Sequence, residues 1–266
     1  MFRGFYTVAS GMLAHQRKTE MLSNNLANAN TPGYKSDQSA MRAFPEMLLQ
    51  RMSADQLPTE NGLRIPGANS LKTGLNTGVY MQEAIPLYLQ GDIRQTNKST
   101  DLALVDQGPG MSLFTVQLPD GGINYTRNGN FSLDHDGNLV TGGGLFVLDE
   151  KGEKITLQSE EFTVLANGTI TQNNTEVAKL GISYAENPLI LKKEGGGIYS
   201  IEENNLPQAT ENASVQQGFL EGSNVDEGRT MTDMLSAYRA FEANQKVLQA
   251  YDRSMEKAVN EVGRVN

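Results

Sequence analysis

Proline is confined to the middle of this 266-residue chain. All nine prolines lie between Pro32 and Pro207, and none precedes or follows that interval. Proline removes a backbone donor and clashes with the preceding helical turn, so proline-free segments can form long helices. The glycines are also concentrated in the middle, which favours turns and short strands there. The distribution predicts an α+β fold with helices at both ends and a β-rich centre.

A long helix is predicted near the C-terminus. No glycine or proline occurs from Arg229 to Val262, and apolar side chains recur there at three- and four-residue spacings. That spacing places an apolar stripe along one side of a helix, as in a coiled-coil seam. The same repeat passes through two polar positions, Gln245 and Asp252, so the stripe is interrupted. The predicted seam residues are Met234, Tyr238, Phe241, Leu248, Met255, Val259 and Val262.

A partner helix is predicted at the N-terminus, where Phe5 and Met12 share an apolar face and extend the seam. This helix should end near Asn28, because the sequence Asn-Ala-Asn-Thr-Pro-Gly combines capping residues, a proline and a turn glycine. Two arrangements are open. The terminal helices could pair as a coiled coil, or each could pack on the central domain. We expect the first, because the rest of each helix is polar.

The centre of the chain is predicted to be all-β. Met111–Leu118 alternates with period two and runs into a Pro-Asp-Gly-Gly turn, and Asn128-Gly129 and Asp136-Gly137 are hairpin-type pairs. Short antiparallel strands without intervening helices favour a small sandwich or irregular barrel. Further strands are predicted at Ile123–Thr126, Phe131–Leu133, Leu139–Thr141, Leu145–Leu148, Lys154–Leu157, Phe162–Leu165, Thr169–Thr171 and Val177–Tyr184.

These elements predict three parts. Residues 1–33 with 226–266 form a discontinuous coiled-coil helical domain. Residues 77–199 form the central β domain, and residues 34–76 with 200–225 form an extended linker region. Within that linker a short helix is predicted over Phe44–Met52.

Composition excludes several functions. The chain carries 22 Lys and Arg against 31 Asp and Glu, without a basic block, so nucleic-acid binding is not expected. No apolar run approaches the roughly 18 residues of a membrane-spanning helix, so no membrane insertion is expected. The absence of cysteine and the presence of only two histidines disfavour thiolate metal sites and histidine-based catalysis. We predict no catalytic residue, no metal ligand and no cofactor.

The end of the N-terminal helix carries an unusual cluster of asparagines. Asparagine is a poor helix former, but its side chain can satisfy the free backbone groups of a helix end. A helix cap is therefore the plain explanation, but caps rarely contain so many asparagines. The segment comprises Asn24, Asn25, Leu26, Ala27, Asn28, Asn30, Thr31, Gly33, Tyr34 and Lys35.

This segment resembles the N-terminal signature of the flagellar rod and hook protein family, through Asn25, Leu26, Ala27, Asn28, Thr31, Gly33, Tyr34 and Lys35. Gln217–Asp226 and Met234–Lys246 are similar to the C-terminal part of that family. Thr126–Phe131, followed by Asp136–Val140, looks like the β domain of its distal-rod branch. Pro109 and Gly228 depart from the family pattern.

The resemblance implies a structural subunit of the bacterial flagellar basal body, not an enzyme. Such a subunit polymerises into the rod or hook-base, which transmits torque and encloses the export channel. The resemblance makes the segment from Asn24 to Lys35 a candidate assembly motif, which would fix the turn after the N-terminal helix and its contacts with neighbouring subunits. The implied partners are further copies of the chain, other rod and hook proteins and the flagellar type III export apparatus. Export without a cleaved signal peptide and an extracytoplasmic location follow from the same resemblance, and the first residues lack the long apolar stretch of a signal peptide.

Two other functions are weighed against this one. The first is a secreted adhesin or regulatory binding module that uses the β domain. The second is an enzyme acting on cell-wall glycan, which would need two acidic residues about 5–9.5 Å apart in a cleft. The sequence does not single out such a pair.

Overall fold

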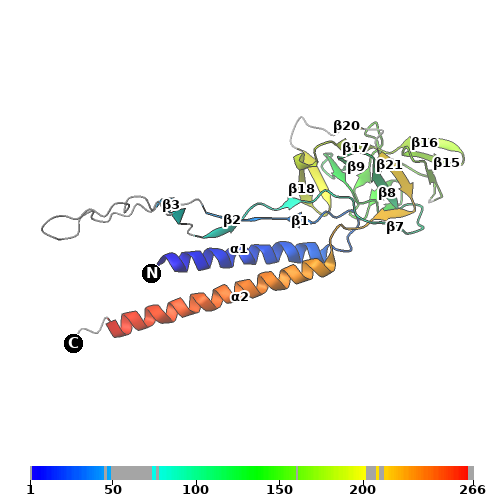
Figure 1. The fold of residues 1–266 in the computed structure, drawn as a ribbon. Coiled ribbons are helices and arrows are strands. Elements are labelled where there is room, and N and C mark those ends of the chain that lie inside the picture. Colours follow the sequence, from blue (N-terminus) through cyan, green and yellow to red (C-terminus); the bar gives the residue numbers. More distant parts are fainter. Residues whose placement is uncertain are drawn as a thin grey trace. The chain divides into compact units, whose positions relative to one another are not determined.

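The structure, a computed structural model, describes residues 2–44, 47–48, 74–75, 78–159, 161–201, 208–209 and 213–262. Helices occupy the two ends of the chain and short strands fill the middle (Figure 1). This confirms the predicted order of elements. The chain divides into two compact units, which are described separately. The helical unit contains residues 1–23, 38–85 and 229–266, and the β unit contains residues 24–37 and 86–228.

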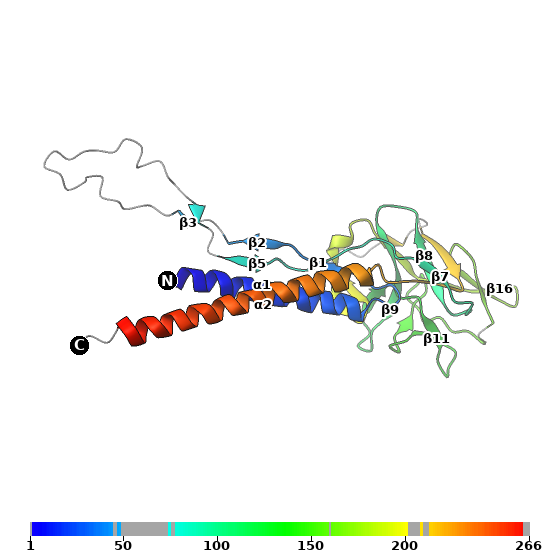
Figure 2. The ribbon, with the colours of Figure 1, turned by 60° about the horizontal axis from the view of Figure 1, so that its bottom comes forward.

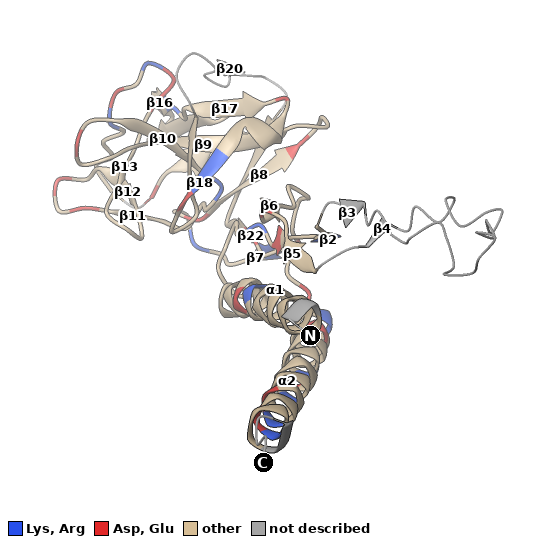
Figure 3. Cartoon of the chain, turned by 90° about the vertical axis from the view of Figure 1, so that its left-hand side faces the viewer, with Lys and Arg blue, Asp and Glu red and all other residues tan. Residues whose placement is uncertain are grey.

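Two long helices are the main elements of the helical unit. Helix α1 spans Phe2–Ala27, and its last residues belong to the β unit. Helix α2 spans Glu227–Lys257 and continues into a π-helical turn at Ala258–Val262. Glu227 in the first turn and Lys257 in the last turn of α2 both complement the helix dipole. Figure 3 shows acidic and basic residues interspersed along α2.

A β-ribbon completes the described part of the helical unit (Figure 2). Strand β2 (Met41–Ala43) pairs antiparallel with β5 (Val79–Met81), and β3 (Met47–Leu48) pairs with β4 (Gly74–Leu75). The ribbon touches α1 where the backbone N–H of Val79 donates to Ser10 Oγ at 3.3 Å. The predicted helix over Phe44–Met52 is wrong at Met47–Leu48, where strand pairing prevails, and most of its other residues lie outside the described ones.

A nine-stranded sheet forms the centre of the β unit. Its longest strand, β9 (Met111–Gln117), pairs antiparallel with β10, β13 and β17. The other strands of this sheet are β10 (Ile123–Thr126), β11 (Phe131–Leu133), β12 (Leu139–Thr141), β13 (Phe146–Val147), β17 (Ile182–Ala185), β18 (Leu191–Gly195), β19 (Ile198–Ile201) and β20 (Gln208–Ala209).

Smaller sheets join distant parts of the chain. Strand β8 (Leu102–Asp106) pairs with β21 (Ala213–Gln217), and β7 (Ile93–Gln95) pairs with β22 (Phe219–Glu221). A three-stranded sheet contains β14 (Thr163–Val164), β15 (Thr169–Gln172) and β16 (Thr175–Lys179). The remaining short elements are β1 (Asp37–Gln38), β6 (Ile85–Pro86) and the 3-10 turn Pro188–Ile190.

Two strand predictions need correction. The predicted strand Val177–Tyr184 is divided between β16 and β17, because Leu180 forms an isolated bridge to Asp149 and Gly181 belongs to no strand. A Cβ at Gly181 would lie 2.7 Å from the carbonyl oxygen of Asp149. Predicted strand Lys154–Leu157 forms only isolated bridges, Lys154 to Leu148 and Thr156 to Asn138. A bridge of one residue on each side does not make a ladder.

The β unit buries two apolar clusters. The larger one includes Leu102 and Leu104 of β8, Phe114 of β9 and Val215 of β21. The smaller one is centred on Tyr125 and Tyr199. The larger cluster joins β8 to β21, so residues far apart in sequence complete it. Within the described residues, neither helix is long and apolar enough to cross a lipid bilayer.

Candidate functional site

The asparagine cluster ends α1 and satisfies its last carbonyl groups. Both the backbone N–H and the side-chain amide of Asn28 donate to the carbonyl oxygen of Asn24, at 3.1 and 2.9 Å. The Thr31 hydroxyl donates to Asn28 Oδ1 at 3.2 Å. Asn28 and Thr31 therefore act as a local cap, the plain explanation expected for such a cluster.

Asn25 has a second role, because it is buried and holds the chain that returns past the helix end. Its Nδ2 donates to the carbonyl oxygen of Asp37 at 2.8 Å, and its Oδ1 accepts from the N–H of Asp37 at 2.9 Å. The Tyr34 hydroxyl donates to the same Oδ1 at 3.2 Å. Burial, reinforced by the negative charge of Asp37, raises the pKa of Tyr34 to about 12. Residues 25–37 thus form a closed turn held by side chains.

Gly33 brings this turn against the β unit's own backbone. Its φ is +70°, and its N–H donates to the carbonyl oxygen of Glu221 at 2.8 Å. A Cβ at this position would lie 2.7 Å from the carbonyl carbon of Arg127 and 2.8 Å from the N–H nitrogen of Asn128. Glycine is required here both by the backbone conformation and by the close approach.

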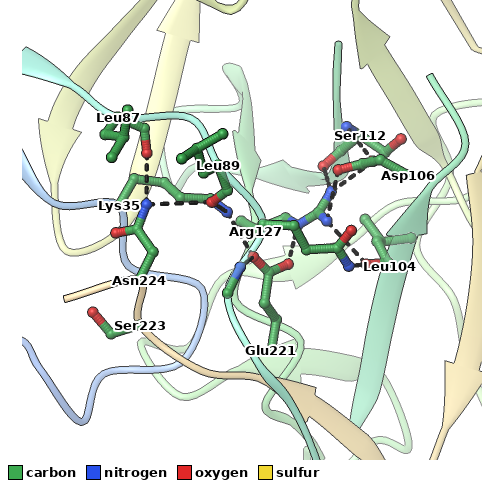
Figure 4. A network of polar contacts seen from close by, with 12 residues as sticks. Lys35, Leu87, Leu89, Leu104, Asp106, Ser112, Arg127, Glu221, Ser223 and Asn224 are labelled. Carbon is green, nitrogen blue, oxygen red and sulfur yellow. Dashed lines mark hydrogen bonds and ion pairs between the residues drawn. The ribbon is translucent and has the colours of Figure 1, made fainter. Parts of the chain in front are cut away.

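Lys35 reaches a carboxylate far away in the sequence. Its Nζ contacts Glu221 Oε1 at 2.6 Å and the carbonyl oxygen of Leu89 at 2.7 Å (Figure 4). The side chains of Lys35 and Glu221 are 1% and 2% exposed. Burial lowers the pKa of Lys35, with the positive charge of Arg127 acting in the same direction and Glu221 opposing both. The ammonium is therefore retained by its partners, not by solvent.

Arg127 lies on the other side of the same carboxylate (Figure 4). Its Nε is 2.5 Å from Glu221 Oε2, and its terminal nitrogens contact both oxygens of Asp106 at 2.8 and 3.0 Å. The guanidinium also donates to the carbonyl oxygens of Ser112 and Leu104. Burial alone would lower the pKa of Arg127, but Glu221 and Asp106 hold it above its usual value. We call Lys35, Asp106, Arg127 and Glu221 the buried charge network.

Asn224 adds uncharged bonds next to this network. Its Oδ1 accepts from the N–H of Ser36 at 2.7 Å, and its Nδ2 donates to the carbonyl oxygens of Leu87 and Leu89 at 2.7 and 3.2 Å. The chain entering α2 is therefore tied to the chain leaving α1 by side-chain bonds as well as by charge.

Sequence reasoning brought Lys35 into the candidate motif but missed Arg127, Glu221, Asp106 and Asn224. A signal was present, because Arg127 and Glu221 lie within two segments that carry the family resemblance. Both are charged residues beside short apolar strands, where a side chain is easily buried. Nothing in the sequence indicated that they meet.

The remaining residues of the candidate motif are less buried than Asn25, Gly33, Tyr34 and Lys35. Leu26 is half-buried, whereas Ala27 and Asn30 are exposed. The side-chain amide of Asn30 donates to the carboxylate of Glu227 at 3.3 Å.

The predicted helix seam is unevenly covered in the single chain. Its half-buried members are Met12, Met234, Phe241, Leu248 and Met255. Phe5, Tyr238 and Val259 are 36%, 58% and 71% exposed. The side chain of Val262 lies outside the described part.

Two glycines mark where the helices approach each other. A Cβ on Gly4 would lie 2.3 Å from the hydroxyl oxygen of Tyr251, and one on Gly11 would lie 3.1 Å from Nδ2 of Asn244. Residue numbers rise along α1 as they fall along α2, so the two helices run antiparallel here. Across the described residues, no group of three or more His, Cys, Asp or Glu side chains is arranged to hold a metal ion.

Comparison with known proteins adds independent information. Three family models match: "Flagella basal body rod protein" at residues 5–35, "Flagellar hook protein FlgE/F/G D1 domain" at 107–172 and "Flagellar basal body rod FlgEFG protein C-terminal" at 216–261. The flagellar hook-basal body complex protein FlhO of Bacillus subtilis is 45% identical over the full length of both chains. The chain belongs to the flagellar basal-body rod and hook protein family.

More distant members of the family also match along almost the whole chain. FlgG of Bacillus subtilis, a flagellar basal-body rod protein, is 31% identical over 98% of this chain and 99% of its own. FlgF of Caulobacter vibrioides is 29% identical over the whole of both chains. The predicted family is confirmed, and with it a structural role in the flagellar basal body. The adhesin or binding-module alternative has no support in these relatives, and the family is not known as enzymatic.

Each of the three matched regions contributes to the buried charge network. Lys35 lies in the first, Arg127 in the second and Glu221 in the third. The network is therefore the point at which the regions typical of the family are joined.

Proposed function

We propose that this subunit polymerises into the rod or hook-base through its two terminal helices, which pair as an antiparallel coiled coil. In α2 the buried and half-buried residues fall mainly on one heptad repeat. That repeat consists of Thr230, Met234, Ala237, Phe241, Asn244, Leu248, Tyr251, Met255 and Ala258. It shares Met234, Phe241, Leu248 and Met255 with the predicted seam and has Ala237 and Ala258 in place of Tyr238 and Val259.

Helix α1 offers a matching repeat, which begins with small residues. Gly4, Val8, Gly11, His15 and Lys18 follow the same spacing, and none of them is exposed. The approaches of Gly4 to Tyr251 and of Gly11 to Asn244 support one antiparallel register. Glycine facing a large side chain fits a closely packed helix pair, because the missing Cβ leaves room for the knob.

The outer faces of both helices support contacts with neighbouring copies. Tyr6 and Leu13 of α1 are 66% and 56% exposed, and Tyr238 and Val259 of α2 are exposed to a similar or greater degree. Leaving these large apolar side chains exposed to water does not stabilise a monomer. Exposed apolar surface of this kind marks sites of interaction with other proteins. Tyr238 and Val259, predicted as seam residues, would then face an adjoining subunit instead of α1.

The finer parts of the function rest on the family. The polymer would transmit torque, enclose the export channel and adjoin other rod and hook proteins. The subunit would reach this extracytoplasmic position through the flagellar export apparatus without a cleaved signal peptide. The division into 1–33 with 226–266, 34–76 with 200–225, and 77–199 remains our proposal for its domains.

The test is electron microscopy of basal bodies purified from cells that lack the gene, together with a swimming assay. Rods that are missing or truncated, without hook or filament, are the expected result. Normal rods, hooks and swimming would contradict the proposed role.

A substitution at Asn28 tests for an effect on assembly that is separate from any effect on folding. Asn28→Leu should leave the β unit folded, because Asn28 bonds only within the turn 24–31, yet it should block assembly by altering the exit from α1. Normal assembly of Asn28→Leu would refute a role for this residue in polymerisation.

A further inference from the structure

Glu221 is shared by three chain segments that are distant in sequence. Its carboxylate binds Lys35, 186 residues away, and Arg127, 94 residues away. It also accepts the backbone N–H of Gly91 at 2.9 Å, while its own carbonyl oxygen accepts the N–H of Gly33. One residue therefore holds the segment that leaves α1, the loop after β10 and the loop before β7.

The strand that carries Glu221 has little support apart from these bonds. Strand β22 is three residues long and pairs only with β7, which is equally short. A two-stranded ribbon of this length is not stable by itself in water. The segment 33–36 forms no strand and is held by side chains and single backbone bonds. Each segment therefore relies on the other for part of its bonding.

The balance of charges makes the segment that carries Lys35 and the strand that carries Glu221 depend on each other. Two cations, Lys35 and Arg127, face two carboxylates, Glu221 and Asp106, and three of these side chains are at most 2% exposed. Withdrawing Lys35 leaves Glu221 with a single cation, and withdrawing Glu221 leaves Lys35 buried without a carboxylate. A buried charge that loses its partner is strongly unfavourable, whereas the complete set is tolerated.

We propose that the buried charge network makes the ordering of residues 33–36 and of strand β22 one cooperative event. The segment that follows α1 and the strand that precedes α2 then become ordered together or not at all. The idea concerns folding of the single chain and does not depend on the proposed polymer.

Amide hydrogen exchange on the full-length protein tests this without any substitution. The informative N–H groups are those of Gly33, Gly91 and Gly222, which bond to Glu221 O, Glu221 Oε1 and Asp92 O. Measured by NMR at low denaturant concentrations, their exchange should show one opening free energy and one denaturant dependence. Clearly different opening free energies for Gly33 and Gly222 would overturn the proposal.

A pair of variants supplies the second test. Lys35→Met keeps the length of the apolar stem and removes the charge, so exchange should rise about a hundredfold or more at Gly91 and Gly222 as well as at Gly33. The control is Lys193→Met, which removes less buried contacts to the same segment: Lys193 Nζ lies 3.1 Å from Asp37 Oδ1, donates to the carbonyl oxygen of Lys35 at 3.1 Å and lies over the Tyr34 ring. It should raise exchange around residues 34–37 but not at Gly91 or Gly222.

The exchange results for Lys35→Met distinguish cooperative ordering from a local increase in opening. A rise in Lys35→Met confined to residues 33–37 would overturn the proposal, because the effect would then not reach β22. If Lys35→Met fails to fold, the exchange measurement on the unsubstituted chain decides. Glu221→Gln, combined with Lys35→Met, should show a double-mutant coupling, since each change removes the same contact.

Discussion

Replacing Gly33 by alanine tests whether the turn after α1 needs close contact with the β unit's backbone. A left-handed conformation costs a residue with a Cβ about 1–2 kcal/mol. The new Cβ would also lie 2.7 Å from the carbonyl carbon of Arg127 and 2.8 Å from its oxygen, which are backbone atoms that cannot rotate away. Overpacking of this kind costs about 1–3 kcal/mol. We therefore expect the free energy of unfolding to fall by about 2–5 kcal/mol.

The matched control is Gly152→Ala. Gly152 has φ +82°, close to that of Gly33, but a Cβ there would meet nothing within 4 Å. Its substitution should cost only the conformational part, about 1–2 kcal/mol. The difference between the two variants isolates the steric part.

The assay is thermal unfolding of the full-length protein, followed by circular dichroism and tyrosine fluorescence and calibrated by urea titration. For a unit of this size, the loss in Gly33→Ala corresponds to a Tm about 4–20 °C lower. If Gly33→Ala and Gly152→Ala were equally destabilised, the contact between Gly33 and the Arg127 backbone would contribute nothing, and the reasoning would be refuted.

Three further predictions address other parts of the molecule. The chain has no cysteine, so a designed disulfide can be followed without interference. The double variant Gly11→Cys, Asn244→Cys should form a disulfide on oxidation, visible as a gel shift. The control, Gly11→Cys with Val247→Cys, should not form one, because Val247 is exposed. The pKa of Tyr34 is raised to about 12 in the folded chain, so the stability it contributes is complete below pH about 10 and is lost as the pH rises through 12. Urea unfolding from pH 8 to 12 should show this loss, and Tyr34→Phe should make it shallower. Arg127→Lys keeps the charge but loses the forked contacts, so the free energy of unfolding should fall by about 3 kcal/mol or more, and an unchanged urea midpoint would contradict the bonding described.

The parts of the fold that could be predicted depend on local sequence. The strands Ile123–Thr126, Phe131–Leu133 and Leu139–Thr141 match the predictions, because each alternates or is bounded by turn residues. The pairing of β8 with β21 could not be predicted, because residue patterns identify strands but not their distant partners. Strand β22 was missed because its residues were assigned to the extended linker region 200–225.

The candidate site divides in the same way. Residues 24–35 stood out because asparagines crowd a helix end, and the cap they form is local. Arg127 and Glu221 lie in segments that resemble the family, but the sequence did not pair them, because a buried ion pair across a long separation has no sequence period. In α2 the burial pattern differs from the predicted stripe by one residue at alternate positions. Large apolar residues drew the prediction to Tyr238 and Val259, whereas small Ala237 and Ala258 are more covered.

The pairing of β8 with β21 also decides when the β unit can close as the ribosome makes the chain. Leu102 and Leu104 are made first, but Val215, which packs in the same core, is made only after the strands between them. Strand β8 therefore waits for its partner β21 while the rest of the sheet is synthesised. The β unit completes its core only when β21 has left the ribosome, so its last folding step comes late in its own synthesis.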